Sequence, residues 1–142
     1  LFPACRVTTV AAGRICAVWC TWDVGAVSQG IVYKFYDLFR EDEAFTRGKL
    51  KTWGVWGLSD TPPSDGSWDG WIKLMDCSSH KPSGLPVGEI TGEDWEYLKA
   101  GEDFEFPPEA PAVRYIRFKV LETWGGDDFI HFTEFTFWGN PE

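Results

Sequence analysis

Two segments of the sequence combine aromatic rings with charged side chains, one running from Asp37 to Lys49 and the other from Thr123 to Phe129. Aromatic rings stack on the apolar C–H faces of sugars, while carboxylates, amides and guanidinium groups bind the hydroxyls. The alternative is a pair of solvated charged loops with Trp124 packed beneath one of them. On the first interpretation, the ligand-binding residues are Asp37, Arg40, Glu43, Phe45, Arg47, Trp124, Asp127, Asp128 and Phe129.

Signatures of catalysis and of zinc binding are weak by comparison. The sequence contains no G-x-S-x-G elbow, no phosphate-binding loop and no H-E-x-x-H motif. Its 22 acidic residues include some suitably spaced pair by accident, so their number does not argue for glycoside hydrolysis. His131 near Glu134 is open to an acid–base interpretation, but a packed or solvated histidine is the simpler one. His80 and His131 have no accompanying cysteine pair, so we expect neither a zinc site nor an enzyme.

The composition indicates one acidic, aromatic-rich domain over residues 1–142. Apolar residues make up 44% of the chain and aromatic residues 17%, which is sufficient for a sizeable core. The net charge of −9 would repel nucleic acid and anionic membranes, so we expect neither as a partner. No stretch reaches the roughly 20 apolar residues that span a membrane, so we expect no insertion by this segment.

The N-terminal region is atypical. Residues 1–16 show no clear periodicity, and the chain begins at Leu1 without a basic and apolar leader, so we expect a piece of a larger precursor. Four cysteines allow three full pairings, and free buried thiols are the simpler interpretation. They are Cys5, Cys16, Cys20 and Cys77.

Short alternating segments separated by turn residues favour an all-β sandwich. Three tryptophans, Trp22, Trp53 and Trp71, fall in such segments and are expected to be buried. The expected strands are Val18–Val24 (ending at Gly25), Ile31–Asp37, Leu50–Leu58, Trp71–Met75, Ala112–Leu121 and Phe132–Trp138.

One short helix is expected within the long loop that follows Cys77. Thr91 can cap it, with Asp94 as the acidic partner of a capping box, and Gly101 can close it. Trp95 and Tyr97 would then pack this helix onto the sandwich.

Five short motifs occur in the order and spacing typical of discoidin-like domains, over about residues 20–140. The chain thereby resembles the galactose-binding-like jelly rolls of the coagulation factor V/VIII C type. Two further runs, Lys81–Pro86 and Leu121–Gly126, are similar to discoidin-like domains of Bacteroidetes glycan-utilisation lipoproteins. The five motifs are Trp22-Asp23-Val24-Gly25, Trp53-Gly54-Val55-Trp56-Gly57-Leu58-Ser59-Asp60, Asp65-Gly66-Ser67-Trp68, Val113–Glu122 and Glu134-Phe135-Thr136-Phe137-Trp138-Gly139.

The resemblance implies a jelly-roll β-sandwich and a non-catalytic carbohydrate-binding module. Its ligand would be a neutral polysaccharide or oligosaccharide, bound by loops at one end of the sandwich. The module would belong to a larger exported protein at the periplasmic or outer cell surface, with other domains of that protein as partners. The alternative is a structural or protein-interaction domain of a surface glycan-uptake complex that binds no sugar itself, and a small hydrolase ranks third.

No cofactor is expected to be required, although the resemblance implies a possible structural calcium. Glu134 matches the family position that often lies beside such an ion, and Asp127-Asp128 is an alternative acidic pair. The usual L-F-D-G segment, which supplies part of the calcium site, is replaced here by Leu1-Phe2-Pro3-Ala4-Cys5. This departure puts the calcium site in doubt.

Overall fold

The computed structural model describes residues 2–8, 19–36, 41–126, 130 and 134–141, with side chains described for 21–34, 41–126, 130 and 135–141. Strands dominate this part of the chain, together with one α-helix, α1 (Gly92–Ala100), and one turn of 3-10 helix at Glu41–Glu43. The strands are β1 (Phe2–Thr8), β2 (Trp19–Tyr36), β3 (Leu50–Leu58), β4 (Ile72–Ser78), β5 (Glu102–Glu105), β6 (Val113–Thr123) and β7 (Glu134–Pro141).

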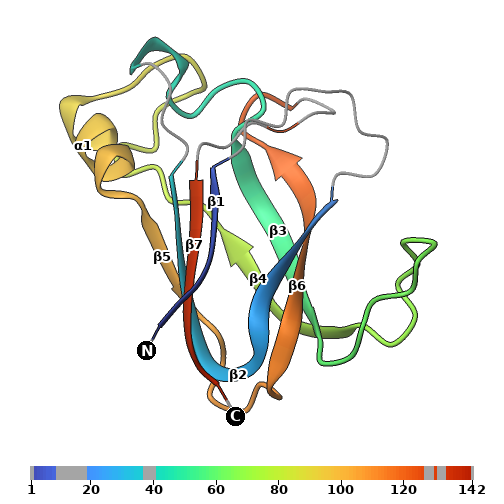
Figure 1. Ribbon diagram of the computed structural model, residues 1–142. Helices are drawn as coiled ribbons and strands as arrows, with labels where there is room; N and C mark the ends of the chain where they lie inside the picture. Colours follow the sequence, from blue (N-terminus) through green and yellow to red (C-terminus); the bar gives the residue numbers. More distant parts are fainter. Residues whose placement is uncertain (1, 9–18, 37–40, 127–129, 131–133, 142) are drawn as a thin grey trace.

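The strands pair antiparallel in the order β1-β7-β2-β6-β3-β4, and β5 adds to β2. The early part of β2 pairs with β6 and its late part pairs with β7 and β5. Between these parts β2 curves round one end of the molecule, so the ladder forms two layers (Figure 1). One layer holds β5, late β2, β7 and β1, and the other holds early β2, β6, β3 and β4. The predicted all-β sandwich with one short helix is confirmed.

The continuity of β2 differs from the prediction of two strands separated at Gly25. The structure joins both segments into one strand, with irregular pairing between Asp23 and Ser28 and again between Gln29 and Val32. Gly25 has a φ of 90°, in the left-handed region where a side chain would be strained. The glycine therefore permits the bend that was predicted there, but the strand continues through it.

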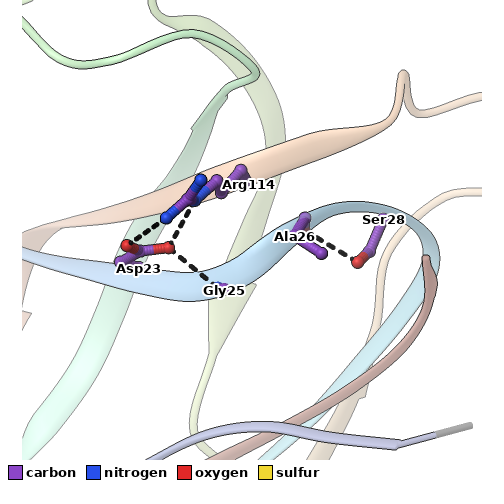
Figure 2. Close-up of polar contacts among 5 residues, drawn as sticks. All are labelled: Asp23, Gly25, Ala26, Ser28 and Arg114. Atoms are coloured by element: carbon purple, nitrogen blue, oxygen red, sulfur yellow. Dashed lines mark hydrogen bonds and ion pairs between the residues drawn. The ribbon is translucent and has the colours of Figure 1, made fainter. Parts of the chain in front are cut away.

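A bidentate ion pair joins this bend to β6 (Figure 2). The Asp23 carboxylate accepts hydrogen bonds from Arg114 Nε at 2.9 Å and from Arg114 Nη2 at 3.0 Å. The same carboxylate accepts the N–H of Gly25 at 2.8 Å, and the Ser28 hydroxyl donates to the carbonyl of Ala26 at 2.9 Å. Two of the sequence motifs therefore meet in space, because Asp23 of one motif binds Arg114 of another.

The core between the layers is built from aromatic rings. Trp22 lies 4.8 Å, centroid to centroid, from both Phe118 and Phe135, and Tyr33 lies 5.1 Å from Phe118. Trp22 and Trp53 are 5% and 0% exposed, which confirms their predicted burial. Each such ring contributes about 2 to 3 kcal/mol through its removal from water.

Helix α1 begins and ends where the sequence predicts. The Thr91 hydroxyl accepts the N–H of Asp94 at 3.2 Å, and the Asp94 carboxylate accepts the N–H of Thr91 at 3.0 Å, which completes the capping box. Trp95 and Tyr97 pack with Leu98 in a second, smaller core beneath the loops rather than in the main core. No helix among the described residues has the length and apolar character needed to cross a membrane.

Because of the Asp23–Arg114 pair, we expect the folded protein to be more stable at neutral pH than in acid. The hydrogen bond from Arg114 lowers the pKa of Asp23 below its ordinary value of 3.8. A carboxyl group whose pKa is lower in the folded than in the unfolded protein stabilises the fold, and this contribution is complete at pH values above the unfolded pKa. It is lost as the pH falls through the folded pKa. We therefore expect wild type to be more stable than Asp23→Asn at about pH 7, with the difference vanishing in strong acid.

The measurement is urea unfolding from neutral pH down to about pH 2. Asn keeps an oxygen for the Gly25 N–H, so the comparison isolates the charge. Asp69→Asn, at an exposed loop position, is the control. A pH-independent difference between wild type and Asp23→Asn would contradict the assignment.

Candidate functional site

The loops opposite the bend of β2 form the end of the sandwich at which sequence analysis placed a ligand. Helix α1, the 3-10 helix and the loop before α1 gather there (Figure 1). Four of the predicted ligand-binding residues lie in the described part, namely Glu43, Phe45, Arg47 and Trp124. The other five lie outside the described residues, and they are Asp37, Arg40, Asp127, Asp128 and Phe129.

Phe45 is a support of the loop. Its side chain is 1% exposed and packs with Ala44 and Leu98. Phe45 has a φ of 51°, an uncommon backbone conformation for a residue with a side chain, which is retained where packing enforces it. The ring therefore has no exposed face, which differs from the prediction that it contacts a ligand.

Trp124 is half-buried beside Phe45. The two rings meet edge to face at a centroid distance of 5.3 Å, and the Lys51 ammonium lies 5.0 Å from the centre of the Trp124 ring. The backbone N–H of Trp124 donates to the carbonyl of Lys49 at 2.8 Å. This arrangement brings Phe45 of one predicted loop together with Trp124 of the other.

Glu43 and Arg47 are exposed, and a groove lies at the same end of the molecule. The groove has a volume of about 290 Å³ and runs between the 3-10 helix and the loop that precedes α1. One wall is acidic and the other is formed by backbone and an aliphatic side chain. The lining residues are Glu41, Asp42, Ala44, Gly88 and Ile90.

A buried ammonium holds the second wall of the groove in place. Lys81 is 6% exposed, and its Nζ donates to the carbonyls of Leu85, Pro86 and Glu89 at 3.0, 3.1 and 2.6 Å. The Pro86 carbonyl also accepts the N–H of Glu89 at 3.1 Å, so Lys81 adds a second donor there and satisfies the carbonyls of Leu85 and Glu89. The Lys81 side chain therefore fixes the shape of the loop that carries Gly88.

A second buried charge ties the same loop to α1. The Asp94 carboxylate, which is 0% exposed, accepts the N–H and the hydroxyl of Ser83 at 2.8 and 2.6 Å, in addition to the N–H of Thr91. Burial alone would raise the pKa of Asp94, but the hydrogen bonds from Ser83 and Thr91 outweigh it and lower the pKa. The capping-box pattern identified Asp94 in the sequence, whereas nothing in the pattern pointed to its bond with Ser83.

Glu102 is a third buried charge below the loops. Its carboxylate is 4% exposed and accepts the Ser79 hydroxyl, the His80 N–H at 3.1 Å and the Tyr97 hydroxyl at 3.1 Å. Burial raises the pKa of Glu102, and these hydrogen bonds oppose the rise. Burial and the neighbouring Glu102 raise the pKa of Tyr97 to about 12.

A small enclosed cavity adjoins this carboxylate. Its volume of about 10 Å³ is near the space that one water occupies. The cavity lining combines polar and aromatic side chains with two buried charges of opposite sign. Its members are Phe45, Lys49, Leu50, Ser79, Leu98, Glu102 and Trp124.

The acidic side chains that were predicted to bind calcium lie outside the described part of the structure. No group of three or more His, Cys, Asp or Glu side chains that could hold a metal occurs within this part of the chain. Glu134 begins β7, but its side chain is outside the described set, as are Asp127 and Asp128. The calcium site therefore stays a prediction.

Comparison with known proteins finds a matching family model and two similar solved structures. A family model described as a domain of unknown function, DUF5000, matches residues 3–139. The solved structure of the SusE-like protein BT2857 is 44% identical with a TM-score of 0.84, and the match covers 89% of this chain and 48% of that chain. A comparison with curated proteins finds no match.

A second solved structure supports the fold alone. It is a fragment of a putative chitobiase from Bacteroides thetaiotaomicron, 20% identical with a TM-score of 0.54, and the match covers 87% of this chain and 61% of that one. The chain thus spans about half the length of the SusE-like structure, at 48%, and somewhat more of the chitobiase fragment.

Loss of the Lys81 ammonium is expected to loosen the loop that forms the groove. Lys81→Met keeps most of the side-chain volume but removes the ammonium from three carbonyls, of which only that of Pro86 keeps a second donor, the N–H of Glu89. Each carbonyl left buried and unpaired costs roughly 1 to 3 kcal/mol. We expect stability to fall by about 2 kcal/mol or more in urea unfolding, with faster amide exchange across residues 82–91. Lys99→Met, at an exposed lysine paired with Glu96, should change stability by less than about 0.5 kcal/mol. Equal effects of the two variants would contradict the assignment.

Glu102 gives stability a pH dependence opposite in sign to that of Asp23. Because its folded pKa lies above the ordinary value of 4.5, stability falls as the pH rises between the two values. Glu102→Gln keeps an acceptor oxygen without the charge, so its stability relative to wild type should be greater at about pH 8 than at about pH 4. Glu105→Gln, at an exposed position of the same strand, is the control. Urea unfolding at both pH values measures the effect, and an unchanged difference would refute it.

Proposed function

The chain belongs to the DUF5000 family of domains, and on this premise we propose that it is a non-catalytic carbohydrate-binding module. Its parent would be an exported Bacteroidetes protein of glycan utilisation, located at the periplasmic or outer cell surface. The observation that carries the proposal is the likeness to a SusE-like protein, at 44% identity and a TM-score of 0.84. The remainder of the larger protein and its surface complex would be the partners of the module.

We propose a discoidin-like ancestry for the domain. The pairing of Asp23 with Arg114 supports it, because two separate motifs of the resemblance form one contact at the bend of β2. A structural calcium near Glu134 is part of the same proposal. If calcium binds, a chelator should lower the midpoint of thermal unfolding of the full chain.

The proposed ligand site is the groove beside the 3-10 helix. It is open, about 290 Å³ in volume, and its two walls present carboxylates and an apolar side chain at one place. Lys81 and Asp94 fix the conformation of the loop beside the groove, so less conformational entropy is lost when a ligand binds. Glu43 and Arg47 are exposed in the same segment as Glu41, Asp42 and Ala44 of the groove, and we propose that they bind hydroxyls of the ligand.

Affinity electrophoresis tests the function. The chain is run through gels containing amylopectin, galactomannan, xyloglucan, levan or the acidic polymer polygalacturonate. We expect at least one neutral polysaccharide to retard it, and no retardation by polygalacturonate because the chain carries a net charge of −9. Asp42→Ala and Arg47→Ala should weaken retardation by roughly tenfold, whereas Glu109→Ala, in the turn between β5 and β6, should leave it unchanged.

Two outcomes would oppose these statements. Unretarded migration in every neutral gel would overturn the binding function and favour a structural or docking domain. Retardation that survives in both loop variants would keep the function but remove the groove from it.

A further inference from the structure

The outer face of the layer formed by early β2, β6, β3 and β4 carries an aromatic surface that is separate from the loop end. Trp53 and Val55 of β3 are both 0% exposed and point into the core. Side chains alternate along a strand, so Gly54 and Trp56 lie on the opposite, outer face. Trp56 is half-buried there.

Gly54 allows the Trp56 ring to lie directly on the sheet. A Cβ built at Gly54 would be 2.4 Å from Cζ3 and 2.8 Å from Cη2 of Trp56, so the six-membered part of the indole occupies the space that any other side chain would fill. The close approach explains a glycine in the interior of a strand with neighbours on both sides, where it is otherwise unfavourable. The Trp56 ring thus lies in close contact with the backbone at Gly54.

Trp68 stands beside this ring at an angle. The two centroids are 5.2 Å apart and the ring planes are inclined by 67°. The loop that carries Trp68 is fastened to the sheet by Arg117, whose Nη1 donates to the carbonyls of Gly66 and Ser67 at 3.2 and 3.0 Å. The Arg117 guanidinium also lies 4.7 Å from the Trp68 ring centre and 4.2 Å from that of Trp71. Trp56 and Trp68 therefore form a fixed corner.

Charged side chains of both signs flank the Trp56 ring. Gly54 is paired with Asp76 on β4 and with Lys119 on β6, and both of these residues are exposed. Lys73 is exposed as well, with its ammonium 5.5 Å from the Trp56 ring centre and 3.0 Å from Asp76.

An open hollow of about 380 Å³ extends the surface along β3 and β4. Asp76 lines this hollow and is also the β4 partner of Gly54, and we call the Trp56 ring, Asp76 and the hollow together the strip. The residues that line the hollow are Thr52, Trp53, Asp76, Cys77, Ser78, Leu121 and Glu122.

We propose that this strip is a second carbohydrate-binding surface, which takes a neutral oligosaccharide stacked on Trp56. The inference rests on the proposed function for its ligand class and adds a site that is independent of the loops. The ring offers a flat apolar area for the C–H face of a sugar, and Asp76 and Lys119 offer an acceptor and donors for hydroxyls on either side. Their opposite charges leave the strip without a strong field of either sign, which suits an uncharged ligand.

The Lys73 ammonium lies over the Trp56 ring, so a sugar stacked on this ring must displace the ammonium or form a hydrogen bond with it. Its pair with Asp76 is exposed at both ends and is worth little, so releasing it costs little. The corner itself needs no rearrangement because Arg117 and Gly54 already hold both rings.

The test compares two matched tryptophan substitutions in the full chain, using affinity gels of amylopectin, galactomannan, xyloglucan and levan. Trp56→Ala removes the ring on the sheet face, and Trp124→Ala removes a ring at the loop end. Two sites on one polymer reinforce each other, so we expect Trp56→Ala to weaken retardation by about tenfold or more. Thermal unfolding checks that the variant is folded.

A second variant displaces the ring without removing it. Gly54→Ala places a methyl group where the indole lies, so the Trp56 ring must shift while its chemistry is kept. We expect this variant to lose retardation as Trp56→Ala does. Lys34→Ala, on late β2 in the other layer, is the control and should migrate as wild type does.

The outcomes separate the inference from the function on which it rests. If Trp56→Ala and Gly54→Ala are both retarded as strongly as the wild type, the sheet-face site is overturned and the loop-end function is unaffected. Absence of retardation of the wild type in all four gels would overturn both. Loss in the two sheet-face variants, with the control unchanged, supports the second surface.

Discussion

The structure depends on one strand that belongs to both layers of the sandwich. Because β2 pairs with β6 in its early part and with β7 in its late part, the two layers cannot shift independently. The bend needs a residue that tolerates a φ of 90°, and Gly25 supplies it. The Asp23–Arg114 pair then connects the bend to β6. With this end closed, the loops collect at the other end, and the outer face of β3 is left open.

The loop end is stabilised in a different way from the core. Its small apolar cluster has three buried members, Ala44, Phe45 and Leu98, which is too little to order long loops alone. Buried charges with several hydrogen bonds help to order these loops. A buried ion is stable only while its hydrogen bonds are made, so it holds the groups that bind it in position. Lys81 and Asp94 act in this way on the same loop, from opposite signs of charge.

Sequence patterns predicted the features that depend on local spacing. Strand patterns predicted the burial of Trp22 and Trp53, and the capping box located α1, since both follow from the geometry of one element. The continuity of β2 and the roles of Lys81 and Glu102 were missed. Their partners are set by how loops fold onto one another, which no period in the sequence records. The burial of the Phe45 ring was not foreseen for the same reason, as the ring packs with Leu98 of α1, which is distant in the sequence.

Gly54 shows how a departure from a strand pattern carries information. Glycine inside a strand costs about 0.5 to 1 kcal/mol relative to alanine, and an indole can be buried in many ways that avoid this cost. What the glycine secures is the close approach of the Trp56 ring to the backbone, with Asp76 and Lys119 paired to Gly54 on either side. On the proposed function, a ring that is held in place in this way is ready to receive a flat ligand. The glycine therefore links the packing of β3 to the proposed second surface.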